Sequence, residues 1–149
     1  MPTPKKFPAE DSVVLLMRIA LHGLRRSFTT RLAEYEIPYS VWYFLRILWE
    51  DDGLSQKDLT RRAGVLQPNA VSAIRTMEEM GLARVERGVD DRRRIRVWLT
   101  PKAKELEQQI LPKIRADADR LAFHNFDDEE RQMLTRLLKK VCANVAPRG

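Results

Sequence analysis

The sequence predicts a mainly α-helical protein with a small β-ribbon, an α+β fold, on three observations. Ser55 caps a helix that ends at Gly64, and a second helix opens at Gln67-Pro68 and ends at Gly81. Two alternating segments, residues 83–87 and 94–99, then predict a pair of short strands. Helix, short turn, helix and ribbon in this order indicate a winged helix-turn-helix, with longer helices on both sides.

The second strand of the ribbon is rich in arginine. From Arg94 to Leu99, arginine or tryptophan alternates with Ile, Val and Leu, which is the pattern of a half-buried strand. Residues 88–91, Gly-Val-Asp-Asp, predict a tight turn before it. We therefore expect a ribbon with a cationic tip, and arginine at such a tip is attracted to the negative potential of a DNA groove.

Two helices are expected before the helix-turn-helix. The first runs from about Asp11 to about Glu36 with Asp11 or Ser12 as its cap, because its apolar residues recur at helical spacing. Ser40 is expected to cap the second helix, which covers residues 41–50. That helix is apolar on nearly every side, so we expect it to be buried.

Two more helices are expected after the ribbon. Thr100 caps the first, in which Pro112 predicts a kink or a local break, and its apolar stripe extends to Leu121. Asp127 caps the last, with acidic residues in its first turn and lysines near its end. The helices at both ends of the chain carry apolar stripes that the small winged unit cannot cover, which predicts a homodimer, although a monomer that packs its own helices together is the alternative.

These elements define the expected domain organisation. Residues 1–10 form a flexible arm, residues 11–36 and 101–146 form a helical dimerisation region, and residues 37–100 form a winged helix-turn-helix DNA-binding domain.

Composition narrows the function classes. The chain has 149 residues, a formal net charge of +6 and a sequence pI near 9.8, which favours an anionic partner such as nucleic acid. A single cysteine, Cys142, allows neither a disulfide framework nor a zinc site, and we expect no cofactor. We find no signal peptide, no membrane-spanning segment and no catalytic motif. The expectation is a cytoplasmic protein that is not an enzyme.

Three motifs resemble the DNA-binding core of the MarR family of transcriptional regulators. They are Leu-Ser-Gln-Lys-Asp-Leu at 54–59, Met-Glu-Glu-Met-Gly-Leu-Ala at 77–83, and Asp91-Arg92-Arg93 continuing to Leu-Thr-Pro-Lys-Ala at 99–103. The resemblance implies a homodimeric regulator, a repressor that a small ligand releases from a pseudo-palindromic operator. The ligand in similar proteins is often an aromatic carboxylate, and its thioester is a second possibility here.

Candidate DNA contacts lie on the second helix of the motif and on the ribbon. On the helix, an inward stripe of Val71, Ile74, Met77 and Met80 would leave an outward set of polar residues for bases and phosphates. The outward set is Gln67, Pro68, Asn69, Ser72, Arg75 and Thr76. On the ribbon, the resemblance places the family's Asp-x-Arg pair on Asp91 and Arg93, with Arg93 in the minor groove. Arg92 and Arg94 are expected on phosphates or in solvent.

A ligand pocket is expected between the first two helices. Aromatic faces would stack on a ring, and an arginine would neutralise a carboxylate. The candidate set is His22, Arg26, Tyr39, Trp42, Tyr43 and Arg46. The structural alternative is that Trp42 belongs to the core and that the charged residues face water. Three other functions compete: a non-specific architectural DNA-binding protein, a regulator that senses oxidation at Cys142, and an interaction module that binds a foreign protein through its terminal helices.

Overall fold

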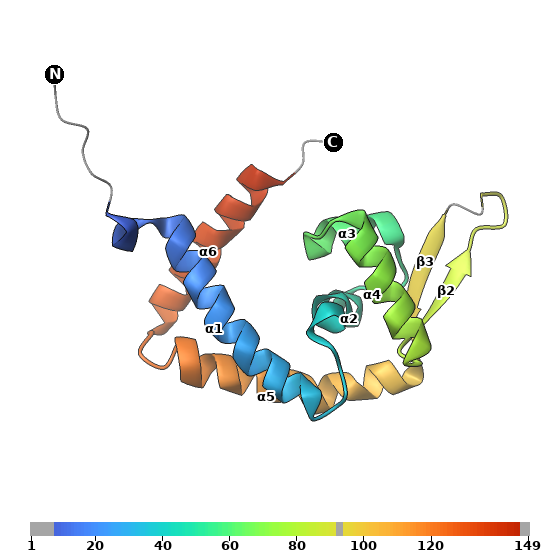
Figure 1. Ribbon diagram of the computed structural model, residues 1–149, viewed down its shortest axis with the longest axis horizontal. Helices are drawn as coiled ribbons and strands as arrows, with labels where there is room; N and C mark the ends of the chain where they lie inside the picture. Colours follow the sequence, from blue (N-terminus) through green and yellow to red (C-terminus); the bar gives the residue numbers. More distant parts are fainter. Residues whose placement is uncertain (1–7, 92–93, 147–149) are drawn as a thin grey trace, which may run out of the picture.

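The computed structural model of the chain describes residues 8–91 and 94–146, and its elements follow the predicted order. A winged helix-turn-helix stands on one side, and α1, α5 and α6 extend from it (Figure 1). The elements are a 3-10 turn at Ala9–Asp11, α1 (Val13–Ala33), α2 (Tyr39–Glu50), β1 (Leu54–Ser55), α3 (Gln56–Ala63), α4 (Gln67–Glu79), β2 (Ala83–Arg87), β3 (Ile95–Leu99), α5 (Pro101–Ala122) and α6 (Asp128–Val145). Within these residues, no helix is both long and apolar enough to cross a membrane.

The helix starts follow the predicted capping chemistry with one exception. The side chains of Ser12, Ser55 and Thr100 each accept a backbone N–H of the turn that they cap, and Asp127 forms a reciprocal capping box with Glu130. The expectation that Ser40 caps the second helix is wrong. That helix begins at Tyr39 directly after Pro38, so Ser40 lies inside its first turn.

The core lies in the winged unit and is centred on α2. Val41, Trp42, Phe44, Leu45 and Leu48 of α2 are buried, as its apolar composition predicted. They join the inward residues of α3, α4 and the sheet in one cluster. The buried part of α5 extends this cluster toward α1, so α5 connects the winged unit to the terminal helices (Figure 1).

The inward face of α4 differs from the predicted stripe. Ala70, Ala73, Ile74 and Met77 are buried, whereas Val71 is 48% exposed. The prediction of Val71 as inward is wrong because two alanines fill the tight contact of α4 with α2 and α3. The helix is therefore turned so that a valine faces outward.

The sheet has a third strand that the sequence did not suggest. The order is β1-β3-β2, antiparallel throughout, with Leu54 opposite Val97 and Val85 opposite the same residue on the other side. The two residues of β1 are too few to produce an alternating pattern. Val97 and Leu99 are buried, as the alternation predicted.

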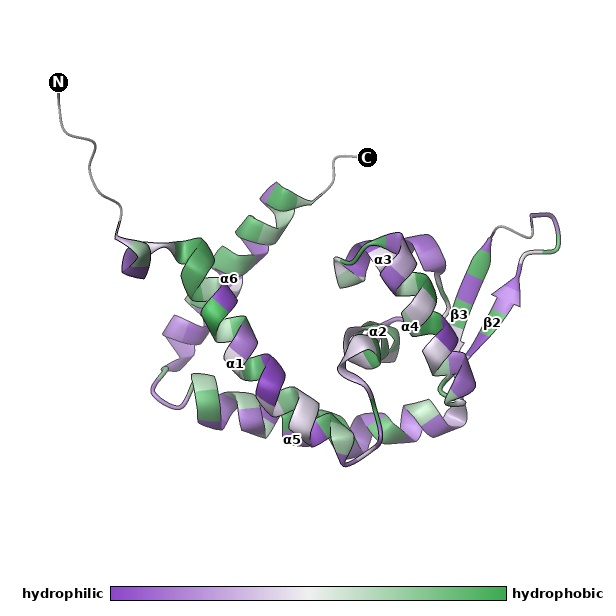
Figure 2. Ribbon diagram, viewed as in Figure 1, coloured by the Kyte–Doolittle hydropathy of each residue, from purple (hydrophilic) through white to green (hydrophobic). Residues whose placement is uncertain are grey.

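The C-terminal helices differ from expectation in two respects. α5 continues from Pro101 through Pro112 to Ala122, so Pro112 does not end the helix. Leu121 is exposed instead of lying on an inward stripe. α6 buries none of its residues within the chain, and Figure 2 shows hydrophobic residues along α6 and the first half of α1. The exposed large hydrophobic residues there are Val13, Val14, Leu16, Ile19 and Leu21 on α1, and Met133, Leu137, Leu138, Val141 and Val145 on α6.

Candidate nucleic-acid interface

The outward face of α4 carries the predicted polar residues. Asn69, Ser72 and Arg75 are exposed, and Gln67 and Pro68 form the first turn after Leu66. In this first turn Pro68 has no N–H and the Asn69 N–H donates to the Leu66 carbonyl at 3.0 Å, so the Gln67 N–H is the one that no side chain caps. An exposed helix start of this kind can donate to phosphate oxygens, and the outward side chains can reach base edges.

Arg75, the cationic residue of α4, forms a salt bridge with Glu79 on the same face of the helix. Arg75 Nε donates to Glu79 Oε1 at 2.9 Å, with both side chains exposed. Thr76 Oγ1 donates to the carbonyl of Ser72 at 3.0 Å, which turns its hydroxyl hydrogen toward its own helix. Sequence spacing of four residues brings both pairs together on one surface. A contact of Arg75 with DNA would therefore require either that Arg75 exchanges Glu79 for a DNA group or that it binds DNA while still paired with Glu79.

The helix before α4 carries its own basic residues. Arg61 and Arg62 are paired with Asp58 and Asp51 at 3.0 and 2.6 Å, whereas Lys57 is exposed and makes no salt bridge with any described residue. Gly64 ends α3 in the left-handed conformation, which permits the tight turn into α4.

The wing presents arginines at its end. Gly88 N donates to Arg94 O at 2.8 Å, and Arg94 N donates to Asp91 O at 2.9 Å, so Arg94 is tied by its backbone to both Gly88 and Asp91. Arg87 and Arg94 are exposed and make no salt bridge within the described part of the chain. The predicted contacts Arg92 and Arg93 lie outside the described residues. The structure thus places Arg87 and Arg94 at the end of a hairpin that packs beside α4 (Figure 1).

The base of the wing is held by residues that the sequence analysis missed. Asp52 Oδ1 accepts the N–H groups of Leu99 and Gly53 at 2.8 and 3.0 Å, and its Oδ2 pairs with Lys104 at 3.2 Å. Arg96 donates to the Gly53 carbonyl at 2.8 Å. One carboxylate therefore joins the end of α2, the wing and the start of α5. The Asp-Asp-Gly turn was the only sequence signal for it.

The predicted ligand residues are distributed over three environments. Tyr39 OH donates to Tyr43 OH at 3.2 Å, and Arg25 lies 4.7 Å above the Tyr39 ring. Burial is the main cause that raises the pKa of Tyr43 above its ordinary value. Trp42 is only 2% exposed and packs edge-on against Phe28, as the core alternative held.

The charged members of that set do not gather around the tyrosines. Arg46 is paired with Glu50 at 2.7 Å, and His22 is exposed on α1. Arg26 lines a separate hollow of about 420 Å³ between α1 and α5. Arg25 is therefore the cation nearest the tyrosine pair, one position from the predicted Arg26.

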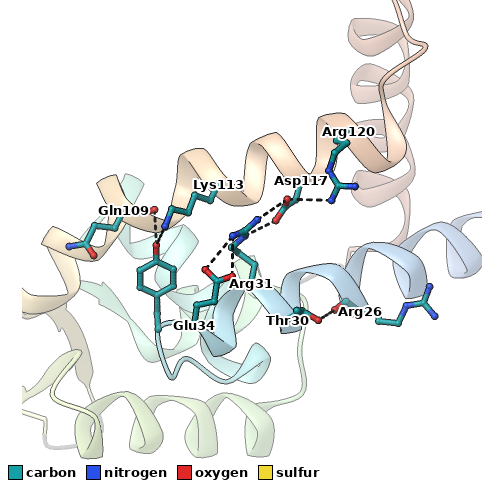
Figure 3. A network of polar contacts seen from close by, with 9 residues as sticks. Arg26, Thr30, Arg31, Glu34, Gln109, Lys113, Asp117 and Arg120 are labelled. Atoms are coloured by element: carbon teal, nitrogen blue, oxygen red, sulfur yellow. Dashed lines mark hydrogen bonds and ion pairs between the residues drawn. The ribbon is translucent and has the colours of Figure 1, made fainter.

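The α1–α5 hollow contains a buried carboxylate. Asp117 is 7% exposed and accepts two bonds from Arg31, at 2.8 and 3.1 Å, while Arg31 also contacts Glu34 (Figure 3). The bonds from Arg31 lower the pKa of Asp117, and they raise the pKa of Arg31 in turn. Asp117 lies in the inward register of α5, three residues after Ile114, and an acid in that register was the signal that could have revealed the pair.

Comparison with known proteins identifies the family of this arrangement. The sequence pattern of the MarR family matches residues 38–95, which contain α2, β1, α3, α4 and β2 and end at Ile95, the first residue of β3. Residues 38–95 of the chain thus match the MarR family. The MarR-family match covers the segment that carries every candidate DNA contact on α4 and the wing.

The relatives that match this chain are transcriptional regulators. The regulator TtmR of Methylorubrum extorquens is 30% identical over 91 residues, which cover 61% of this chain and 47% of TtmR, so the match spans about half of that protein. The homoprotocatechuate degradative operon repressor of Escherichia coli is 26% identical, and the match covers 89% of each chain. The structure of NadR in complex with 4-hydroxyphenylacetate superposes with a TM-score of 0.78 at 25% identity, covering 95% of this chain and 98% of NadR.

Proposed function

We propose that this protein is a homodimeric, sequence-specific repressor that a small aromatic carboxylate releases from a pseudo-palindromic operator. The observation that carries the proposal is the exposed polar face of α4 beside a hairpin with exposed Arg87 and Arg94, which make no salt bridge with any described residue. In a winged helix-turn-helix, this face enters the major groove, and the arginine-rich hairpin contacts phosphates or the minor groove. Arg92 and Arg93, which lie outside the described residues, would add to the same cationic end.

The dimer part of the proposal rests on uncovered apolar surface. The exposed hydrophobic residues of α1 and α6 form the largest apolar surfaces of the terminal helices, and no described segment covers them. A second copy would bury both surfaces across a twofold axis, because the same patch is present on each chain. Residues 11–36 and 101–146 are thus the proposed dimerisation region, and residues 37–100 are the proposed DNA-binding domain.

The ligand part rests on the tyrosine pair of α2 and on Arg25 of α1. Tyr39 and Tyr43 offer aromatic faces, and Arg25 supplies a cation that is in contact with the Tyr39 ring. An aromatic ring with a carboxylate matches these groups. 4-Hydroxyphenylacetate, which is bound in the related NadR structure, has this chemistry. A ligand that prefers one spacing of the two α4 helices would shift the dimer away from DNA.

The test is selection of duplexes from a random pool by the purified protein, followed by titration of the selected duplex. We expect a pseudo-palindromic site bound at least about a thousandfold more tightly than random duplexes at the same salt concentration. Addition of 4-hydroxyphenylacetate or a related aromatic acid should then lower the affinity saturably. Equal affinity for every duplex would show an architectural protein instead, and no binding in dilute buffer would refute DNA recognition.

Light scattering tests the dimer separately. We expect a mass twice that of the 17.4 kDa chain. A monomeric mass at the concentrations used for DNA binding would contradict the dimer and would leave the terminal helices as a surface for another protein.

A further inference from the structure

Exposed apolar side chains of the winged unit gather on the elements proposed to meet DNA. Among the described residues from 37 to 100, four large hydrophobic residues are exposed: Tyr43, Leu66, Val71 and Val89. Leu66 and Val71 lie at the start of α4, and Val89 lies at the end of the wing. Tyr43 has the neighbouring tyrosine as a partner. Among the described residues, Leu66 and Val71 have no aromatic partner of this kind, and their exposed fractions are 75% and 48%.

Val71 occupies a specific row on the helix surface. Gln67, Val71 and Arg75 follow one another at intervals of four residues, so their side chains line one ridge of α4. The valine stands between a polar residue at the first turn and an arginine that Glu79 holds at 2.9 Å. This ridge lies beside the exposed Ser72 and borders the face that would enter the major groove.

The chemistry of Val71 selects a particular base feature. Its side chain has two methyl groups and no donor or acceptor, so it can gain only by removing apolar surface from water. The floor of the major groove offers one apolar group, the C5-methyl of thymine. The remaining major-groove edges carry hydrogen-bond donors and acceptors. A valine placed against them would displace their bound water and offer no hydrogen bond in its place.

We propose that Val71 determines sequence specificity by contacting a thymine methyl group in each half-site of the operator. This inference rests on the proposed function, because it requires that α4 lies in the major groove. It identifies the apolar part of base reading, which complements the polar contacts of Asn69 and Ser72. It also predicts that a cytosine at the contacted position disfavours binding, because its amino group would face the valine.

The test replaces thymine by deoxyuridine at each preferred thymine of the selected duplex. Deoxyuridine keeps the base pair and its hydrogen bonds but lacks the methyl group. For the unmodified protein we expect about a fourfold loss of affinity for each methyl removed at the contacted position. For Val71→Ala we expect the duplexes with thymine and with deoxyuridine to bind equally.

Val89→Ala is the matched control for the methyl readout, because it makes the same truncation at an exposed valine of the wing, which is proposed to contact phosphates or the minor groove, whereas the thymine methyl group lies in the major groove. It should keep the discrimination between thymine and deoxyuridine. Val71 is exposed, so circular dichroism of Val71→Ala should match that of the unmodified protein. The inference is overturned if Val71→Ala still discriminates between thymine and deoxyuridine, or if the unmodified protein does not. In either case, sequence-specific binding to an operator would still stand. If the pool yields no preferred sequence, the proposed function fails first.

Discussion

The indole of Trp98 lies against the backbone of Gly53, where a Cβ atom would come within 2.4 Å of the ring. Gly53 also has a φ of +73°, a conformation that favours glycine. The turn after α2 and the base of the wing are therefore fitted to each other. The Arg84 guanidinium lies over the Trp98 ring, 5.7 Å from the ring centre.

Gly53→Ala is expected to destabilise the protein by at least about 2 kcal/mol, since it adds left-handed strain to a clash with a packed ring. Urea unfolding measures the change. Gly64→Ala is the matched control: its φ is +65°, but nothing lies within 4 Å of the added Cβ. That variant should lose only about 1–2 kcal/mol. Equal losses in the two variants would show that the Trp98 contact contributes nothing.

Asp52 should act mainly as a hydrogen-bond acceptor. Asp52→Ala leaves the N–H groups of Leu99 and Gly53 without their acceptor and should cost about 1–3 kcal/mol. Asp52→Asn keeps an oxygen for both N–H groups and loses only the ion pair with the exposed Lys104, which is worth about 0–1 kcal/mol. Unfolding curves of the two variants decide the point, and an asparagine variant as unstable as the alanine variant would contradict it.

The ion pair between Asp117 and Arg31 predicts that the folded protein loses stability in acid. Its folded pKa lies below its ordinary value because Arg31 donates to it. Its contribution is therefore complete above the unfolded pKa of about 3.9, declines as the pH falls below that value, and is gone once the pH has fallen through the folded pKa. Urea unfolding as a function of pH should show a shallower acid decline for Asp117→Asn. Glu34→Gln, which alters the exposed partner of Arg31, is the control and should retain most of the decline.

Glu79 should weaken DNA binding by holding Arg75. Glu79→Gln frees the guanidinium for a phosphate, and we expect tighter binding with a salt dependence steeper by about 0.9 in log–log slope. Glu78→Gln removes the same charge from the same helix without releasing Arg75, so its slope should change less. Fluorescence anisotropy at several salt concentrations measures both. Identical slopes would mean that Arg75 contacts DNA while it is paired, or does not contact DNA.

Arg93, which the sequence analysis placed in the minor groove, gives the wing prediction. Arg93→Ala should weaken operator binding by about 1–3 kcal/mol, the scale of a good groove contact. Arg115→Ala removes the same charge from the exposed surface of α5 and should have a small effect. Unchanged operator affinity for the Arg93 variant at moderate salt would refute its role.

Local sequence rules explain the agreement between prediction and fold. Ser12, Ser55, Thr100 and Asp127 each cap a helix through a partner three residues later, so the signal and the structure lie within one turn. The burial of alternate residues in β3 is likewise local, because the alternating pattern that predicts it lies within the five residues of the strand. The polar candidates on α4 share a surface because residues three and four apart are neighbours on a helix, although Val71, which the period placed inward, is exposed with them.

The sequence by itself determined the order of the elements, their caps and the charged character of the wing, because these depend on neighbours in the chain. The tertiary structure decided which side of α4 faces inward, and it brought Asp117 to Arg31 across 86 residues and Arg96 to Gly53 across 43. Such pairs depend on how helices rotate and pack, and small side chains such as Ala70 and Ala73 set that rotation through close contact. Neither hydrophobic periodicity nor capping chemistry carries that information.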